Sequence, residues 1–227
     1  MIFTQAQVAS VIDHAVLKTE YSDADIRQAA AMCKRRGIGT LCVRPTDALL
    51  AARELAGSDC RVCVVVGFPL GANRGEVKAL EAEWAIRDGA VELDMVMNVG
   101  RFKSGERALV QQDIAGVVAV AHRHGVIVKV ILETGLLTAC EIADACRLAQ
   151  AAGADYVKTA TGLSGGGATP EAVASMLDTV GSSMKVKASG GIRNWADAVA
   201  FLRQGCSRLG IGSSEAVLDG GQAVGDY

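Results

Sequence analysis

The feature that most constrains this chain is the regular alternation of two kinds of segment along its whole length. Short runs rich in β-branched and other apolar residues, typical of buried parallel strands, alternate with longer stretches of Ala, Leu, Glu and Arg at helical spacing. The predicted strands are Val8–Asp13, Ile38–Arg44, Arg61–Phe68, Ala90–Met97, Val126–Glu133, Asp155–Ala160, Met184–Ser189 and Arg208–Gly212. The clearest helical stretches between them are Ser22–Arg36, Glu76–Asp88, Glu106–His124, Thr138–Ala152 and Pro170–Val180.

The ends of the helical stretches carry start and stop signals. Ser22-x-x-Asp25 is similar to a capping box, and Thr169 places a capping hydroxyl before Pro170 in the first turn. A glycine, the usual residue of a helix C-cap, precedes many of the predicted strands, at Gly37, Gly89, Gly125, Gly153 and Gly205.

Eight strands and about as many helices, with no linker or break in composition, predict a single-domain (β/α)8 TIM barrel over residues 1–227. We expect a flexible C-terminal tail from about residue 219 to residue 227. A doubly wound sheet is the competing fold, but it more often needs fewer strands at this length. The chain also has no Walker A motif and no G-x-G-x-x-G that opens a helix after a strand.

The overall composition excludes several classes of function. Lys and Arg number 23 against 25 Asp and Glu, and aromatic residues make up only 4% of the chain. Nucleic-acid and anionic-membrane surfaces need a basic excess, so neither partner is expected. The seven cysteines form no disulfide framework, and the lone Cys60-x-x-Cys63 has no second ligand pair at zinc-like spacing. We therefore expect reduced thiols, a cytoplasmic protein without a signal peptide, and no metal.

Charged residues alternate with apolar ones inside four consecutive predicted strands. In the fourth strand, Leu93 and Met95 share one face while Glu92 and Asp94 share the other. The apolar face packs on the helices, so the charged face turns toward the barrel axis. The same reasoning turns inward Lys129, Glu133, Tyr156, Lys158, Lys185 and Lys187. Barrel interiors are normally apolar, so these charges must compensate one another, either as a structural ion network or as a catalytic cluster.

The positions of Asp94, Lys158 and Lys187 favour the catalytic interpretation, because they lie toward the C-terminal ends of their strands, where barrel active sites are found. A buried lysine beside another cation loses its proton more easily, and a neutral lysine can attack a carbonyl to form a Schiff base. Lys158 is the candidate nucleophile. Lys187 is then the neighbouring cation and proton carrier, and Asp94 the orienting carboxylate.

Glycine-rich loops after the last three strands are candidates for a phosphate site. Backbone N–H groups in the loops after the seventh and eighth strands commonly bind phosphate in this fold. The candidate substrate-binding and phosphate-binding residues are Thr161, Gly162, Gly190, Gly191, Gly212, Ser213 and Ser214. Arg193 either adds charge to this site or is a solvated helix residue.

Several segments together resemble the deoxyribose-phosphate aldolase family. They are Ile12–His14, Gly67–Gly71, Glu92–Val96, Lys129–Thr134, Lys158–Gly162 and Val186–Arg193. The resemblance implies a metal-free, cofactor-free class I aldolase that cleaves the small phosphorylated sugar 2-deoxy-D-ribose 5-phosphate to glyceraldehyde 3-phosphate and acetaldehyde. It also implies a place in the breakdown of deoxyribonucleotide sugars.

The resemblance assigns roles residue by residue. By motif position Lys158 is the Schiff-base lysine, Lys187 and Asp94 transfer protons, and Asp13 and Tyr227 are candidates for a proton relay. Ala15 stands where the family commonly has threonine, which leaves open what replaces that hydroxyl. Two alternatives stay open: a Schiff-base aldolase that uses a different phosphorylated aldehyde, and a barrel that binds a phosphorylated ligand without turnover. Assembly as a homodimer is possible as well.

Overall fold

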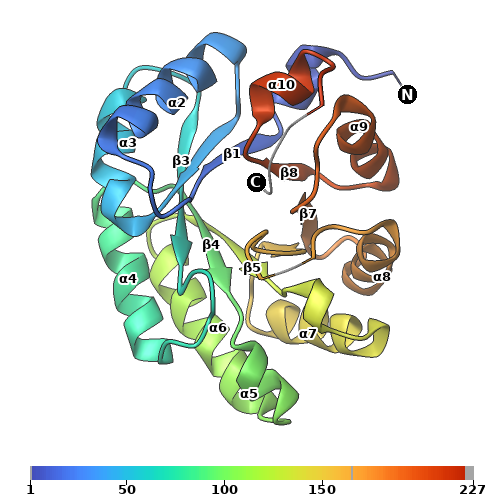
Figure 1. The fold of residues 1–227 in the computed structure, drawn as a ribbon. Helices are drawn as coiled ribbons and strands as arrows, with labels where there is room; N and C mark the ends of the chain where they lie inside the picture. The colour runs from blue at the N-terminus through green and yellow to red at the C-terminus, as the bar shows by residue number, and fades with distance from the viewer. Residues whose placement is uncertain (1, 165, 223–227) are drawn as a thin grey trace.

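A closed barrel of eight parallel strands forms the centre of the molecule (Figure 1), in a computed structural model that describes residues 2–164 and 166–222. Each strand pairs with the next, and β8 pairs with β1, so the TIM barrel prediction is confirmed. The strands are β1 Ile12–Val16, β2 Thr40–Val43, β3 Arg61–Val66, β4 Glu92–Val96, β5 Ile127–Ile131, β6 Tyr156–Lys158, β7 Lys185–Ser189 and β8 Arg208–Ile211.

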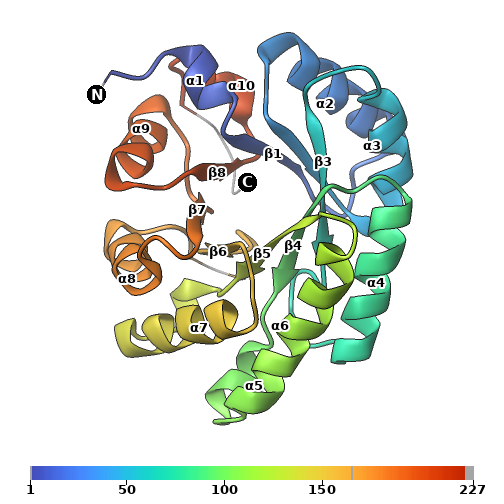
Figure 2. The ribbon, with the colours of Figure 1, turned by 180° about the vertical axis from the view of Figure 1, so that it is seen from behind.

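Helices surround the barrel on its outside (Figures 1 and 2). They are α1 Gln5–Ala9, α2 Asp23–Arg36, α3 Ala48–Glu54, α4 Gly75–Arg87, α5 Val99–Lys103, α6 Arg107–His122, α7 Ala139–Ala151, α8 Pro170–Val180, α9 Trp195–Gln204 and α10 Ser214–Leu218. The 3₁₀ turns Pro45–Asp47 and Thr134–Leu136 follow β2 and β5. The described part of the chain contains no helix that is both long and apolar enough to cross a membrane.

The predicted helix signals act as expected. Ser22 and Asp25 form a capping box at the start of α2, and Thr169 caps α8 through a hydrogen bond from Ala172 N. Gly37 ends α2 with φ 65°, a left-handed conformation that glycine adopts without steric cost. The termini of α2 and α8 were therefore predicted to within a residue from local chemistry.

The first predicted strand, Val8–Asp13, is wrong in its position. Residues Gln5–Ala9 form α1, and the strand follows it at Ile12–Val16. Thr4 and Gln7 form a capping box at the start of this helix, and the Gln5 amide donates to the Leu218 carbonyl at 2.7 Å. The helix is therefore held against α10 (Figure 2), which the run Val8–Asp13 alone did not predict.

The core between barrel and helices is formed by the outward-facing residues of the strands. Leu93 and Met95 of β4, Val128 and Val130 of β5, and Val64 of β3 are all fully buried there. Because side chains alternate along a strand, the residues between them point into the barrel. The strand register thus determines which side chains meet on the axis.

Candidate active site

The barrel interior holds seven charged side chains, each at most 5% exposed, that join into one network. Its members are Asp13, Glu92, Asp94, Lys129, Lys158, Lys187 and Arg208. Six strands supply these residues: β4 contributes two of them, and β1, β5, β6, β7 and β8 contribute one each. Burial of this many charges requires that each be paired, because an isolated buried charge costs several kcal/mol.

Asp94 lies at the centre of the network. Its Oδ2 accepts hydrogen bonds from Lys158 Nζ and Lys187 Nζ, both at 2.7 Å. Its Oδ1 accepts from Lys129 Nζ at 2.9 Å and from the Cys63 thiol at 3.2 Å. One carboxylate therefore brings together the candidate nucleophile and its candidate proton carrier, as predicted from the alternation of β4.

A second carboxylate, Asp13, supports Lys187 from the other side. Asp13 pairs with Lys187 and with the Arg208 guanidinium, and its Oδ2 lies 3.4 Å from Lys129 Nζ. Arg208 also donates to Thr40 Oγ1 at 2.7 Å and pairs with Glu92. Lys187 is thus held between Asp13 and Asp94, where it stays an ammonium.

The pKa values of the two aspartates follow from burial and charge. Burial alone would raise the pKa of Asp94, but the charges of Lys129 and Lys158 outweigh it and hold this pKa well below its ordinary value. Burial likewise opposes ionisation of Asp13, and the Lys129 and Lys187 charges again keep its pKa lowered. Both carboxylates are therefore ionised at neutral pH.

The pKa values of two of the lysines move the other way. Burial favours the neutral amine of Lys187, but the charges of Asp13 and Asp94 overcome it and raise the pKa. Burial and the same two carboxylates act in the same way on Lys129, whose pKa also lies well above its ordinary value. These two lysines therefore remain charged beside the candidate nucleophile.

Comparison with known proteins identifies the family. The model of the DeoC/LacD family aldolases matches residues 7–208. The chain belongs to this family. A deoxyribose-phosphate aldolase of Streptococcus sanguinis is 52% identical, and the match covers 95% of this chain and 97% of the relative's chain. One of Geobacillus is 48% identical, and the match covers 97% of this chain and 98% of that relative's chain. A solved structure described as a putative deoxyribose-phosphate aldolase from Coccidioides immitis has a TM-score of 0.90 at 40% identity, covering 94% of this chain and 85% of its own.

Glu133 of this DeoC/LacD aldolase lies outside the ion network, contrary to the prediction that it points to the barrel axis with the others. It follows the end of β5 with φ 58°, and its carboxylate accepts from Thr161 Oγ1 at 2.5 Å and Thr161 N at 3.2 Å. The Thr161 hydroxyl in turn accepts from Leu163 N at 3.1 Å. Glu133 therefore fixes the loop that follows Lys158.

Lys185 does not point into the network either. It is exposed at the start of β7, and its ammonium lies 5.7 Å from the centroid of the Tyr156 ring. Arg208, by contrast, belongs to the network but was missed. The alternation Arg208, Leu209, Gly210, Ile211 in β8 carried the signal, because Leu209 and Ile211 share the outward face.

The loops of this aldolase that follow β6 and β7 meet backbone to backbone. The Ala168 N–H donates to the Gly190 carbonyl at 3.0 Å. A Cβ on Gly167 would lie 2.4 Å from that carbonyl oxygen, and one on Gly190 would lie 2.9 Å from the Gly167 Cα. Gly162, Gly190 and Gly191 all have positive φ. Glycine at these positions therefore permits the two candidate phosphate loops to touch.

The loop after β8 contributes through its backbone rather than through every side chain. Ser213 occupies the N-cap of α10, directly after Gly212. The Ser214 hydroxyl already has two partners. It donates to the Ile211 carbonyl at 3.1 Å and lies 2.9 Å from Nδ1 of His14 in β1. Arg193 is exposed. Tyr227 lies outside the described residues, so its predicted role in a relay stays a prediction.

Proposed function

We propose that Lys158 is the Schiff-base nucleophile through which this chain acts as a deoxyribose-phosphate aldolase, a carbon–carbon lyase. Its substrate is 2-deoxy-D-ribose 5-phosphate, and its products are D-glyceraldehyde 3-phosphate and acetaldehyde. The observation that supports this proposal most directly is the shared carboxylate: Asp94 Oδ2 lies 2.7 Å from both Lys158 Nζ and Lys187 Nζ. Aldolase chemistry by a lysine requires a neutral amine, and the charges of the network favour one.

The charges of the described network bear on the form that Lys158 takes. Fully ionised, the described network has three carboxylates against four cations, with half-exposed Arg61 reaching Glu92 from the solvent side at 3.4 Å. Loss of one proton brings the buried charges into balance. Lys187 and Lys129 each contact at least two carboxylates, and their pKa values are raised. We assign the neutral amine that the reaction needs to Lys158, which shares Asp94 with both of them.

The reaction then proceeds on the substrate in its open aldehyde form. The Lys158 amine attacks C1, and loss of water gives an iminium ion. The positive nitrogen accepts the electron pair of the C2–C3 bond as that bond breaks, while the proton of the C3 hydroxyl is taken up. Glyceraldehyde 3-phosphate departs, the enamine is protonated at C2, and water releases acetaldehyde and free Lys158.

Proton transfer in these steps is the role that we assign to Asp94 and Lys187. Asp94 contacts both Lys158 and Lys187, so a proton moves from one amine to the other through a carboxylate already in hydrogen-bond contact. Asp13 pairs with Lys187 and keeps it in place. The network thus stabilises the ammonium form of Lys187 and returns a proton to the departing water.

We assign substrate phosphate to the glycine-rich loops after the last three strands. Their backbone N–H groups, in particular those of Gly162, Gly190, Gly191, Gly212 and Ser213, are the donors that we infer for it. Ser214 contributes its N–H alone, since its hydroxyl is already hydrogen-bonded. An anion bound by backbone donors needs no basic side chain, which agrees with the absence of a basic excess in the chain.

Lys158→Arg tests the proposal, because guanidinium keeps the charge but cannot form the imine. We expect cleavage of deoxyribose 5-phosphate to be lost while the variant remains folded by circular dichroism. Substantial turnover in this variant would contradict the assignment. Comparison of deoxyribose 5-phosphate with ribose 5-phosphate tests the substrate, and equal turnover of the two would favour another phosphorylated aldehyde.

We further propose a cytoplasmic homodimer. The location is supported by the seven cysteines, all of which are free thiols. The assembly is supported by α4, on which Val77, Leu80 and Trp84 lie on one face and are 48%, 53% and 55% exposed. This helix face was not evident in the sequence. Sedimentation of Trp84→Glu beside the unmodified protein tests the assembly, and an unchanged mass would argue against this face.

A further inference from the structure

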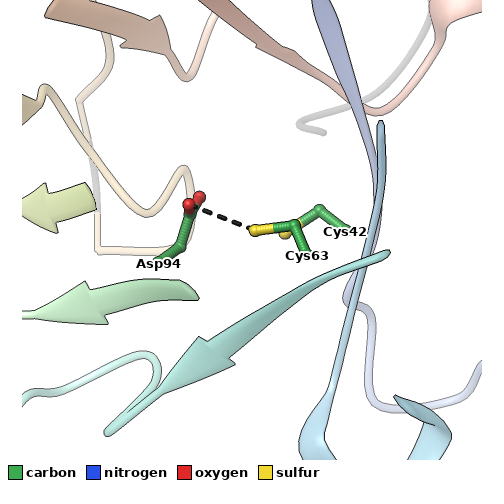
Figure 3. Close-up of side chains that lie close together, drawn as sticks. All are labelled: Cys42, Cys63 and Asp94. Carbon is green, nitrogen blue, oxygen red and sulfur yellow. Dashed lines mark hydrogen bonds between the residues drawn. The ribbon is translucent and has the colours of Figure 1, made fainter. Parts of the chain in front are cut away.

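Two thiols that the proposed mechanism does not use lie side by side in the wall of the active site. Cys42 of β2 and Cys63 of β3 are register partners on adjacent parallel strands, and they are 1% and 0% exposed. Their sulfur atoms and a carboxylate oxygen of Asp94 all lie within 4.8 Å of one another (Figure 3). The pair therefore contacts the residue at the centre of the ion network.

The thiols belong to an apolar wall on one side of the barrel interior. Ala15, Leu17, Cys42, Cys63 and Val65 form a separate buried cluster, against which Phe68 packs. Cys63 of this wall donates to Asp94, which in turn accepts from Lys158. The wall thus borders the place where the substrate aldehyde must meet Lys158.

Cys42, Cys63 and Asp94 also form a set of potential metal ligands, but their surroundings disfavour a cation. Both Asp94 oxygens already accept hydrogen bonds from lysines, at 2.7–2.9 Å. Lys129 Nζ lies 3.5 Å from Cys63 Sγ as well. A divalent ion would have to displace or deprotonate these lysines, so the chemistry of the pair is better sought in the sulfur atoms themselves.

The backbone geometry fits a bond between the two sulfurs. Adjacent strands lie about 4.8 Å apart, and disulfides join Cα atoms about 4.4–6.8 Å apart. Hydrogen bonding with Cys63 lowers the pKa of the Cys42 thiol, and the Lys187 and Lys158 charges lower it further against the effect of burial. A thiol whose pKa is lowered, with a second thiol beside it, is the arrangement that peroxides oxidise.

We propose that Cys42 and Cys63 form an oxidisable dithiol site that hydrogen peroxide converts to a disulfide and that thereby reversibly stops the aldolase. In the first step the Cys42 thiolate attacks one peroxide oxygen, and with one proton it gives a sulfenic acid and water. In the second step the Cys63 sulfur displaces hydroxide from that sulfenic acid, and with the Cys63 proton the products are the disulfide and a second water. Peroxide is smaller than the aldehyde substrate, so a path that admits substrate to Lys158 admits the oxidant.

The disulfide changes the site through Asp94. In the reduced protein the Cys63 thiol donates to Asp94 Oδ1 at 3.2 Å, and oxidation removes that donor. Formation of the bond also draws both sulfurs to about 2.05 Å from each other, which moves the wall beside Lys158. Displacements of about 1 Å in an active site cost up to about a hundredfold in rate. We expect the oxidised protein to lose about tenfold or more of its retro-aldol activity.

The experiment maps disulfides and follows activity in the same samples of the full chain. The background carries Cys140→Ser, because Cys140 is exposed and an exposed thiol is open to oxidation between molecules. After graded hydrogen peroxide, free thiols are alkylated under denaturing conditions and peptides are mapped by mass. Release of glyceraldehyde 3-phosphate is measured before oxidation, after it, and after dithiothreitol.

A second thiol pair in the chain supplies the matched control. Cys33 of α2 and Cys60, just before β3, are hydrogen-bonded to each other at the N-terminal end of the barrel strands. Cys33→Ser/Cys60→Ser removes this pair and should leave basal activity and the peroxide response unchanged. Cys63→Ala removes the proposed partner, so in that variant dithiothreitol should no longer restore activity through a mapped disulfide.

The expected result is a Cys42–Cys63 peptide linkage whose yield follows the loss of activity, with both reversed by dithiothreitol. The proposal is overturned if the linkage does not form, if it forms without loss of activity, or if the response follows Cys33–Cys60. The activity readout rests on the proposed function, whereas the peptide linkage does not. If reduced protein showed no aldolase activity, the proposed function would fail while the mapping still tested the dithiol.

Discussion

Asp94→Asn removes the negative charge at the centre of the ion network while keeping the shape of the side chain. The fully buried carboxylate accepts from three lysines and one thiol. Charge-assisted hydrogen bonds contribute about 1.5–3 kcal/mol each, so simple addition over three lysines would give about 4.5–9 kcal/mol. That sum is too large, because Lys187 keeps Asp13 and Lys129 keeps Glu92 as partners. The loss expected on breaking a buried pair, about 3–5 kcal/mol, is the better figure.

The assay for this variant combines urea unfolding at pH 7 with the rate of deoxyribose 5-phosphate cleavage. We expect the free energy of unfolding to fall by about 3–5 kcal/mol. The cleavage rate should fall at least about a hundredfold, since the carboxylate between Lys158 and Lys187 is also the proposed proton carrier. Both effects come from one atom group, so they should appear together.

Asp113→Asn is the matched control for this experiment. Asp113 of α6 pairs with Lys78 of α4 at 2.5 Å, both side chains are almost fully buried, and neither belongs to the ion network around Asp94. Breaking that pair should destabilise the protein by a similar amount while cleavage continues near its normal rate. If Asp94→Asn changed stability by less than about 1 kcal/mol, as an exposed pair does, or kept activity within tenfold of the unmodified chain, Asp94 would not hold the network together.

Three further predictions concern acid stability and the loops. The pKa values of Asp13 and Asp94 are lowered in the fold, so their contribution to stability is complete above the unfolded pKa of 3.8 and is lost as pH falls below it. Thermal unfolding between pH 6 and pH 2 should therefore show a steep loss of stability below pH 4, and Asp94→Asn should reduce that loss. A flat profile would argue against the network. Glu133→Ala removes the carboxylate that holds the loop at Thr161. The KM for the phosphorylated substrate should rise several-fold, while the rate of Schiff-base formation with acetaldehyde stays nearly constant. An unchanged KM would contradict the role given to Glu133. Gly190→Ala places a Cβ 2.9 Å from the Gly167 Cα, at a residue whose φ is 85°. The free energy of unfolding should fall by about 1–3 kcal/mol, and inorganic phosphate should inhibit cleavage less strongly. A variant as stable as the unmodified chain would show that these loops do not need to touch.

The strand alternation predicted most of the site because it depends on local sequence alone. Leu93 and Met95 are apolar and point outward, which forces Asp94 inward whatever the neighbours are. Lys158 and Lys187 follow in the same way, and the pairing Lys158↔Lys187 places them side by side. A buried charge on one strand therefore predicts compensating charges on the next, and the network confirms it.

The errors arise where local pattern and tertiary register differ. Glu133 and Lys185 continue the alternation of their strands but lie outside the layer in which the charges meet. Glu133 lies past the C-terminal end of β5, and Lys185 is the first residue of β7. Val8 belongs to a helix because a capping box and packing on α10 outweigh its β-branched side chain. The apolar run around Cys63 predicts a small core residue, and it is the register of β3 against β4 that brings its sulfur to Asp94.

Of the three lysines on Asp94, we propose that Lys158 alone is the nucleophile. Incubation with acetaldehyde and sodium borohydride reduces the imine to a stable secondary amine, and peptide mapping by mass then locates the added two-carbon group. We expect a single adduct at Lys158, formed at the same rate whether or not phosphate is present in the loops. An adduct at Lys187 or Lys129, or no adduct in a chain that still cleaves deoxyribose 5-phosphate, would contradict it.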